Sequence, residues 1–175
     1  MGSRAKRYAA MISHSGDLTP FEKVQKWFEA VGMEEYGGHD ALLQSLMTLE
    51  SATSEPTPKH PHHSTTVFSL TIPRTFCNMS GNLHGGAVAL IFDICTSTAI
   101  TACSKEGFWD TGHVSRTLNC TYLRPAAEGT KVFVESEVVH LGRRMGLTRG
   151  VMKTENGKIC YTCEHGKAAV GASSL

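Results

Sequence analysis

One short segment combines residue types that could take part in catalysis. It begins with His84, Gly85 and Gly86, and an apolar run follows that contains a single carboxylate, Asp93. The glycines suggest the start of a helix whose backbone N–H groups a ligand oxygen can approach closely. Burial of an uncompensated carboxylate is costly, so Asp93 must be compensated or used. The segment predicts a hydrolytic site, in which a helix end polarises an electrophile beside a buried acid.

The spacing of these residues bears on how many subunits form the site. A helix rises ~1.5 Å per residue, so Gly85 and Asp93 are roughly 12 Å apart if both lie on one helix. One subunit then cannot bring both groups to the same carbon atom. Two copies with antiparallel helices could place Gly85 of one opposite Asp93 of the other. If the two residues act together, the protein must be an oligomer.

The elements around this segment predict an α+β architecture. A long helix is expected over about 84–104. The segments that read as strands are 65–72, 113–123, 130–140, 145–154 and 158–169. The Asn-Gly pair before the last of them is a strong hairpin signal. Residues 42–53 fit either a first strand or a helix-to-strand junction, and the pattern does not decide between them. One long helix with an antiparallel sheet around it satisfies this order.

The N-terminal part of the chain predicts a separate amphipathic helix. Thr19, Pro20 and Glu22 match an N-cap, a proline at the first helical position and a capping-box acid. Apolar residues then recur at helical spacing. We expect residues 1–40 to form an extension with this helix, and residues 41–175 to form the main domain. The helix should cover the edge or mouth of the core, because it exposes too much apolar surface for water.

Charge and hydropathy exclude several classes of function. The chain has 17 basic and 16 acidic residues, and a net charge of +1 gives no electrostatic reason to expect binding to nucleic acid. Residues 84–104 are apolar enough to suggest a membrane span. Asp93 and the Ser- and Thr-rich second half of this segment argue against one. We therefore expect neither a nucleic-acid partner nor a membrane span.

The cysteines and the N-terminus bear on the compartment. Six cysteines lie mostly in apolar or strand-like segments, and no signal-peptide core is visible near the start. This pattern favours reduced thiols in an intracellular, cytoplasmic protein. Arg4, Lys6 and Arg7, without a nearby acid, leave a mitochondrial location as the alternative.

Two motifs that suggest metal binding lack the pattern of a site. His60, His62 and His63 lie in a proline-rich loop with no cysteine or carboxylate at ligand spacing. Cys160 and Cys163 are three positions apart, so on a strand their side chains point to opposite faces. No glycine-rich nucleotide loop is present either. We therefore expect no metal and no cofactor.

Several motifs together resemble a known family. They are Asn78, Asn82-Leu83-His84-Gly85-Gly86, Asp93, Val114-Ser115-Arg116-Thr117-Leu118-Asn119 and Tyr122-Leu123-Arg124-Pro125. They are similar to the hotdog-fold thioesterases, in the branch that contains the bacterial phenylacetate-pathway thioesterase and mammalian acyl-CoA thioesterase 13. The resemblance covers roughly residues 42–170. It implies a hotdog fold, in which an antiparallel sheet wraps around a long central helix, and a dimer or a dimer of dimers.

The resemblance also implies an activity and roles for four residues. The activity is hydrolysis of an acyl-CoA or acyl-carrier-protein thioester. The Gly85 N–H would hold the developing oxyanion. Asp93 would act as general base or as nucleophile, and the sequence does not choose between them. Ser115 would position the water or bond to Asp93, and Asn78 would orient the carbonyl or the water.

Three further residues are expected at the substrate. They are Asn82, His84 and Gly86, which flank the start of the long helix. Among them, His84 is expected to orient the loop by hydrogen bonding rather than to transfer protons.

Two alternatives remain at this point. Within the enzymes, a hotdog hydratase or dehydratase uses a different pairing of His and Asp. A non-catalytic protein that binds acyl thioesters is the alternative from another class, although Asn78, Asp93 and Ser115 are all intact. The length or aromatic character of the acyl group stays open, because scattered side chains would form its tunnel.

Overall fold

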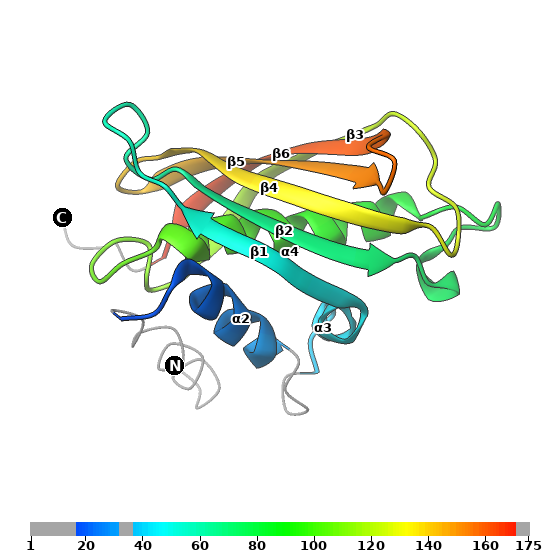
Figure 1. Ribbon diagram of the computed structural model, residues 1–175, viewed down its shortest axis with the longest axis horizontal. Coiled ribbons are helices and arrows are strands. Elements are labelled where there is room, and N and C mark those ends of the chain that lie inside the picture. Colours follow the sequence, from blue (N-terminus) through cyan, green and yellow to red (C-terminus); the bar gives the residue numbers. More distant parts are fainter. Residues whose placement is uncertain (1–16, 32–36, 171–175) are drawn as a thin grey trace.

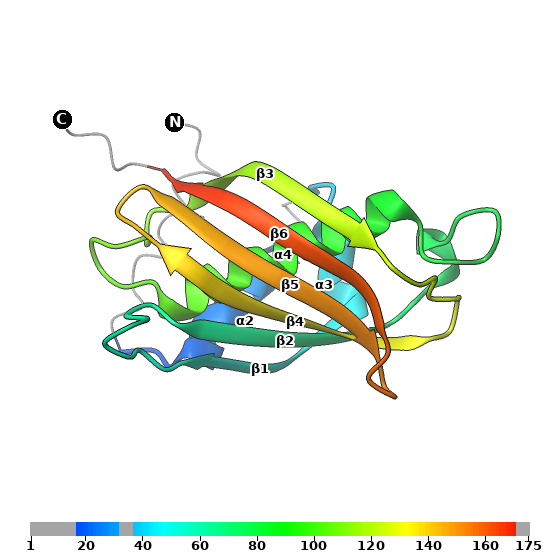
Figure 2. The ribbon, with the colours of Figure 1, turned by 90° about the horizontal axis from the view of Figure 1, so that it is seen from above.

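Six strands form one antiparallel sheet that curves around a long helix (Figure 1). The computed structural model describes residues 17–31 and 37–170. The strands are β1 (Met47–Ser54), β2 (Ser64–Thr71), β3 (His113–Tyr122), β4 (Lys131–Leu141), β5 (Met145–Thr154) and β6 (Ile159–Ala169). The helices are α2 (Pro20–Val31), α3 (Ala41–Leu46), the 3-10 turn η1 (Arg74–Phe76) and α4 (Gly85–Cys103). The strand order is β1-β2-β4-β5-β6-β3, so β1 and β3 are the edges (Figure 2).

This is the α+β architecture that the sequence predicts. Each strand and the central helix expected between residues 65 and 169 begins and ends within one residue of its predicted bound. Residues 42–53, which the pattern left undecided, are a helix-to-strand junction formed by α3 and β1. The basic residues Arg4, Lys6 and Arg7 lie outside the described residues.

Helix α4 is the centre of the core and contacts every strand. Its length and composition would allow it to cross a membrane, but 67% of its apolar window is buried inside the protein. Hydroxyl groups in its second half are satisfied locally or by β2. Thr96 Oγ1 donates to the Phe92 carbonyl, and Thr66 Oγ1 of β2 donates to the Cys95 carbonyl. The Ser- and Thr-rich part of the helix can therefore be buried without unpaired hydroxyls.

Helix α2 docks on its own subunit, against α4 and β1 (Figure 1). Its first turn has the predicted capping box, because the Thr19 N–H donates to Glu22 Oε2 at 2.8 Å and the Glu22 N–H donates to Thr19 Oγ1 at 3.3 Å. Val24 and Phe28 are buried in the main core. Lys23 Nζ also donates to the Ser104 carbonyl at 2.9 Å, which ties α2 to the end of α4. The helix thus covers apolar surface, as expected.

The close approach of α4 to the sheet depends on one glycine of β5. A Cβ atom on Gly150 would lie 2.7 Å from Phe92 Cδ1 and 3.1 Å from Thr96 Cγ2. We predict that Gly150→Ala lowers the free energy of unfolding by ~1–3 kcal/mol, because the buried ring of Phe92 must move. Urea denaturation measures this. Gly142→Ala is the control, since its Cβ meets nothing closer than 3.4 Å. Equal stability of wild type and Gly150→Ala would refute the packing argument.

Candidate active site

The first turn of α4 presents free backbone donors to a ligand. His84 is the N-cap, and its Nδ1 accepts a hydrogen bond from the Gly86 N–H at 3.0 Å. Tyr122 Oη donates to the Gly85 carbonyl at 3.0 Å and so fixes the first turn. The Gly85 N–H has no partner within the described residues. This N–H, at the positive end of the helix, can bind a carbonyl oxygen or an oxyanion. The Gly86 N–H is used by the cap instead.

The loop before α4 holds the two asparagines that the sequence singles out. Asn78 Oδ1 accepts hydrogen bonds from the N–H groups of Ser80 and Asn82, at 3.0 and 3.2 Å. The Asn78 N–H in turn donates to the Asn82 carbonyl at 2.8 Å. The carbonyl oxygen of the Asn78 side chain is therefore used to shape the loop, and its amide N–H₂ is the part that can serve a substrate. Asn78, Asn82, His84, Gly85 and Gly86 thus belong to one end of α4.

Asp93 lies two turns further along α4, beside the edge of the sheet. Ser115 Oγ of β3 donates to Asp93 Oδ1 at 2.8 Å. The sequence predicts that the Asp93 carboxylate is buried. In the single chain this prediction is wrong. The Asp93 side chain is 38% exposed, because it lies at the wall of a pocket rather than under the sheet. The structure therefore brings Asp93 and Ser115 together, and separates them from the Gly85 end of the same helix.

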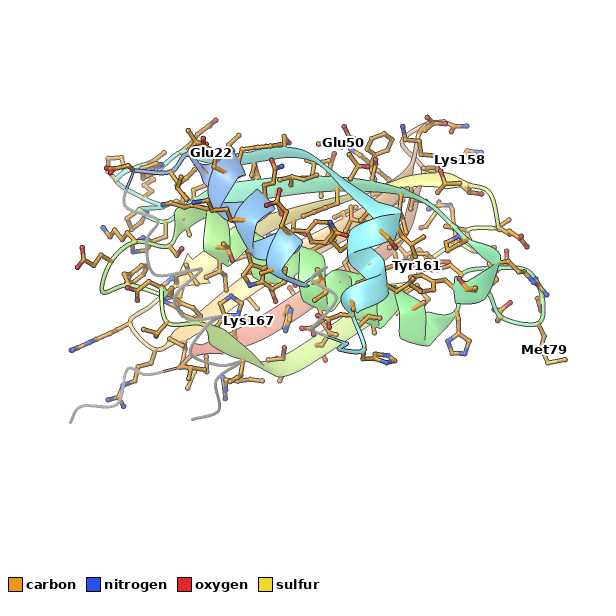
Figure 3. The ribbon with its side chains drawn as sticks, turned by 90° about the horizontal axis from the view of Figure 1, so that it is seen from below. Glu22, Glu50, Met79, Lys158, Tyr161 and Lys167 are labelled. Carbon is orange, nitrogen blue, oxygen red and sulfur yellow. The ribbon has the colours of Figure 1, made fainter. Side chains whose placement is uncertain are left out.

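Two buried polar side chains of β6 complete the surroundings of this carboxylate. His165 Nε2 lies 3.4 Å from Asp93 Oδ1, without an aligned hydrogen bond. Lys167 Nζ lies 3.7 Å from the same oxygen. Figure 3 labels Lys167 close to α4, far from Met79 on the distant loop. Neither residue was predicted from the sequence. A signal was present, since lysine on an otherwise inward-facing row of a strand is rarely buried without a partner.

A β-bulge in β3 brings Ser115 to this cluster. Thr117 pairs with Gly166, whereas Ser115 pairs with Lys167, so Arg116 is an extra residue in the ladder. Regular pairing from Thr117 onward would have placed Arg116 opposite Lys167. The bulge therefore changes the direction of the strand and places Ser115 opposite Lys167, as bulges near active sites commonly do.

A pocket of about 390 Å³ opens beside the carboxylate. Asp93, Ser115 and Lys167 line it together with two indole rings, Trp27 of α2 and Trp109. This volume is within the range of pockets that hold small ligands. Its lining combines aromatic side chains with a few polar groups that lie close to one carboxylate. This arrangement is expected for a site that binds an organic group next to reacting atoms.

Thiols and metals play no evident part in this arrangement. All six cysteines are free, and within the described ranges no three His, Cys, Asp or Glu side chains form a group that could hold a metal ion. Burial raises the pKa of the thiols that lie inside the sheet or helix. These are Cys95, Cys103, Cys120, Cys160 and Cys163.

The fold is shared with several solved structures. A zebrafish protein, thioesterase superfamily member 2, is 25% identical with a TM-score of 0.70, and the match covers 87% of this chain and 99% of that one. The Escherichia coli PaaI protein from the phenylacetic acid degradation operon is 18% identical with a TM-score of 0.65, over 87% of this chain and 97% of that one. A six-stranded antiparallel sheet around one long helix, shared with these proteins, defines a hotdog fold.

The sequence matches agree with this fold. Residues 80–161 match the family model of the thioesterase superfamily. The proofreading thioesterase EntH of Klebsiella pneumoniae is 37% identical over 91 residues, which are 52% of this chain and 64% of that protein. The match thus spans less than two thirds of this relative's length. In both sequence and fold, the chain is thus similar to proteins of the thioesterase superfamily.

The buried histidines of the site should make the fold sensitive to acid. Burial lowers the pKa of His165 to about 4 and that of His113 to about 3, so the native state keeps both neutral. Below pH ~6.5 the unfolded chain binds more protons, and the free energy of unfolding falls by up to ~1.4 kcal/mol per pH unit for each group. The loss from His165 is expected between about pH 6.5 and 4, and that from His113 continues to about pH 3.

Urea denaturation between pH 6.5 and 5 measures this dependence. His165→Gln should reduce its slope relative to wild type. His60→Gln, which changes an exposed histidine of the β1–β2 loop, is the control. Identical slopes for wild type and His165→Gln would contradict the assignment.

Proposed function

We propose that this protein is an acyl-CoA thioesterase, which hydrolyses an acyl-CoA thioester to a free acid and CoA. The observation that carries the proposal is the Asp93–Ser115 pair on the wall of a pocket, on a helix whose first N–H is free. The similarity to the thioesterase superfamily and to a proofreading thioesterase supports thioester hydrolysis. A Streptococcus pneumoniae hypothetical thioesterase protein of the same fold, 17% identical with a TM-score of 0.63, was solved with coenzyme A, which supports CoA as the carrier.

The groups of the site divide the reaction between them. The Gly85 N–H, helped by the positive end of α4, polarises the thioester carbonyl and stabilises the oxyanion. Asp93 takes a proton from the attacking water, or attacks the carbonyl carbon itself. Ser115 holds the carboxylate in place through its hydrogen bond. The Asn78 amide N–H₂ is a second donor for the carbonyl or the water. If Asp93 acts as base, collapse of the tetrahedral intermediate expels the CoA sulfur, which takes up the proton that Asp93 removed from water. If Asp93 attacks the carbon, collapse expels CoA as the thiolate and leaves an acyl anhydride on Asp93. Water then hydrolyses this anhydride to the free acid and the Asp93 carboxylate, and a proton of that water goes to the thiolate.

The site requires two subunits in this proposal. Gly85 and Asp93 are eight residues apart on α4, roughly 12 Å along its axis. Strand β3 is an edge strand, and its apolar side chains Val114 and Tyr122 are each 53% exposed. An exposed apolar edge strand is suited to pair with a second copy. A dimer, or a dimer of dimers, would then place Asp93 of one subunit opposite Gly85 of the partner subunit.

The pocket beside Asp93 is proposed to hold the acyl group. Its aromatic wall includes Trp27, which α2 contributes, so the N-terminal extension is expected to select among acyl groups rather than to take part in the chemistry. We further propose that residues 41–175 form the catalytic domain. We also propose an intracellular, cytoplasmic location, with a mitochondrial one as the alternative, which the six free thiols support.

The first test is the release of free thiol from a panel of acyl-CoA and acyl-carrier-protein thioesters. Asp93→Asn should lower kcat by ~10²–10⁴, because the base is lost while the shape is kept. Ser115→Ala should lower kcat less than Asp93→Asn does, since Ser115 acts through Asp93. Glu164→Gln, an exposed carboxylate of β6, is the matched control.

Near-normal turnover by folded Asp93→Asn would remove this residue from the mechanism. Binding of acyl-CoA without thiol release by the wild type would favour a binding protein. Addition of water to an enoyl thioester would favour a hydratase.

The second test asks whether the site is shared between subunits. Gly85→Pro removes the free N–H at the first helical position, where proline is well tolerated. Asp93→Ala removes the carboxylate. Each homodimer should be inactive, whereas a dimer of one subunit of each kind has one intact site and should recover about half of the wild-type activity. Purified mixed dimers that stay inactive would exclude the composite site.

A further inference from the structure

Lys167 is a charged side chain in a place where charge is costly. It lies on β6, and its side chain is 3% exposed. A lysine is buried to this extent only when partners compensate its ammonium group. Its partners are two hydroxyls and a carboxylate, all within the proposed active site. The proposed mechanism has so far given this residue no task.

The donor chemistry of lysine fixes the direction of two hydrogen-bond chains. An ammonium group only donates, so the Oγ atoms of Ser97 and Ser115 accept from Lys167 Nζ, at 2.8 and 3.1 Å. Each serine must then send its own proton elsewhere. Ser115 donates to Asp93 Oδ1 at 2.8 Å, and Ser97 donates to the Asp93 backbone carbonyl at 2.6 Å. Lys167 therefore sets the orientation of both hydroxyls toward the same residue.

These contacts distinguish the two oxygens of Asp93. The hydrogen bond from Ser115 and the close approaches of His165 and Lys167 all involve Oδ1. Oδ2 receives no hydrogen bond or ion pair from residues 17–31 and 37–170. The side chain is held by one oxygen, and the other is left for a ligand in the pocket that Asp93 lines.

We propose that Lys167 is a positioning residue of the hydrolytic site, whose ammonium stabilises the Asp93 carboxylate and turns the Ser115 hydroxyl toward Oδ1, so that Oδ2 faces the reacting atoms. The inference rests on the proposed hydrolysis. Lys167 itself does not contact the substrate carbonyl in this scheme. It acts through Asp93 and Ser115.

The other titratable groups around Asp93 do not supply this charge. His165 of β6 and His113 of β3 are neutral at pH 7, because burial lowers the pKa of each to about 4 and about 3. Within the described ranges, Lys167 is the one lysine or arginine whose side-chain nitrogen lies within 4.0 Å of the carboxylate. Burial also lowers the pKa of Lys167, and Asp93 opposes this shift. Its ammonium should therefore lose its proton at a lower pH than an exposed lysine.

Substitutions of Lys167 separate its charge from its bulk. Lys167→Met should lower kcat for the best acyl-CoA by about 10- to 100-fold, with KM changed less than about twofold, because the residue acts on the base and not on binding. In the wild type, kcat should fall on the alkaline side as the ammonium loses its proton. In Lys167→Arg, kcat should stay at its plateau up to a higher pH than in the wild type, since a guanidinium stays charged. Spontaneous hydrolysis is subtracted, and Lys158→Met, an exposed lysine of the β5–β6 turn, is the control.

The outcomes separate this inference from the proposed function. Wild-type protein that releases no thiol would refute the proposed thioesterase activity. Two results with an active wild type would overturn the role of Lys167. One is an equal loss of kcat in folded Lys167→Met and Lys167→Arg. The other is a fall of kcat at the same alkaline pH in Lys167→Arg as in the wild type. Should both variants unfold, ¹⁵N NMR of the wild type decides, because a neutral Lys167 amine at pH 7 would overturn the proposal and an ammonium would support it.

Discussion

The packing of α4 into the curved sheet is the constraint on which the rest of the structure depends. All six strands contact this helix, and its apolar surface is the main contribution to the core. A helix enclosed in this way has few places for a charge. Asp93 occupies one of them, next to the edge formed by β6 and β3, where polar side chains and a pocket meet it. The position of the candidate site therefore follows from the way in which the core is covered.

Much of this fold could be predicted from local signals. The capping box of Thr19 and Glu22, the Asn-Gly turn before β6 and the Gly-Gly start of α4 each act over a few residues, so their effects are visible in the sequence. The junction at residues 42–53 could not be decided, because a short apolar run fits both a helix and a strand. The pairing of β3 with β6 could not be predicted from the sequence either, since it joins segments about 50 residues apart and no turn specifies it.

The site was predictable only in part, for a similar reason. Gly85 and Asp93 stand out because a glycine pair and a lone carboxylate are unusual in an apolar run. Ser115 was assigned through family resemblance alone. His165 and Lys167 were missed, although they share the inward-facing row of β6 with Tyr161 and Cys163, because the sequence does not show that this row faces Asp93. The bulge at Arg116 has no sequence signature either, yet it decides which residue of β3 meets Lys167. Side-chain direction on a strand depends on pairing partners, which a single sequence does not show.

The state of the cysteines has a consequence for an enzyme that produces a thiol. Each turnover of the proposed reaction would release CoA, whose sulfhydryl can form mixed disulfides with reactive protein cysteines under oxidising conditions. Exchange of this kind requires a thiolate on the protein. Burial raises the pKa of five of the six cysteines, Cys95 and Cys163 most strongly, and so keeps them in the unreactive thiol form. The same core that positions Asp93 would thus protect these five cysteines from covalent capture by the product of the reaction.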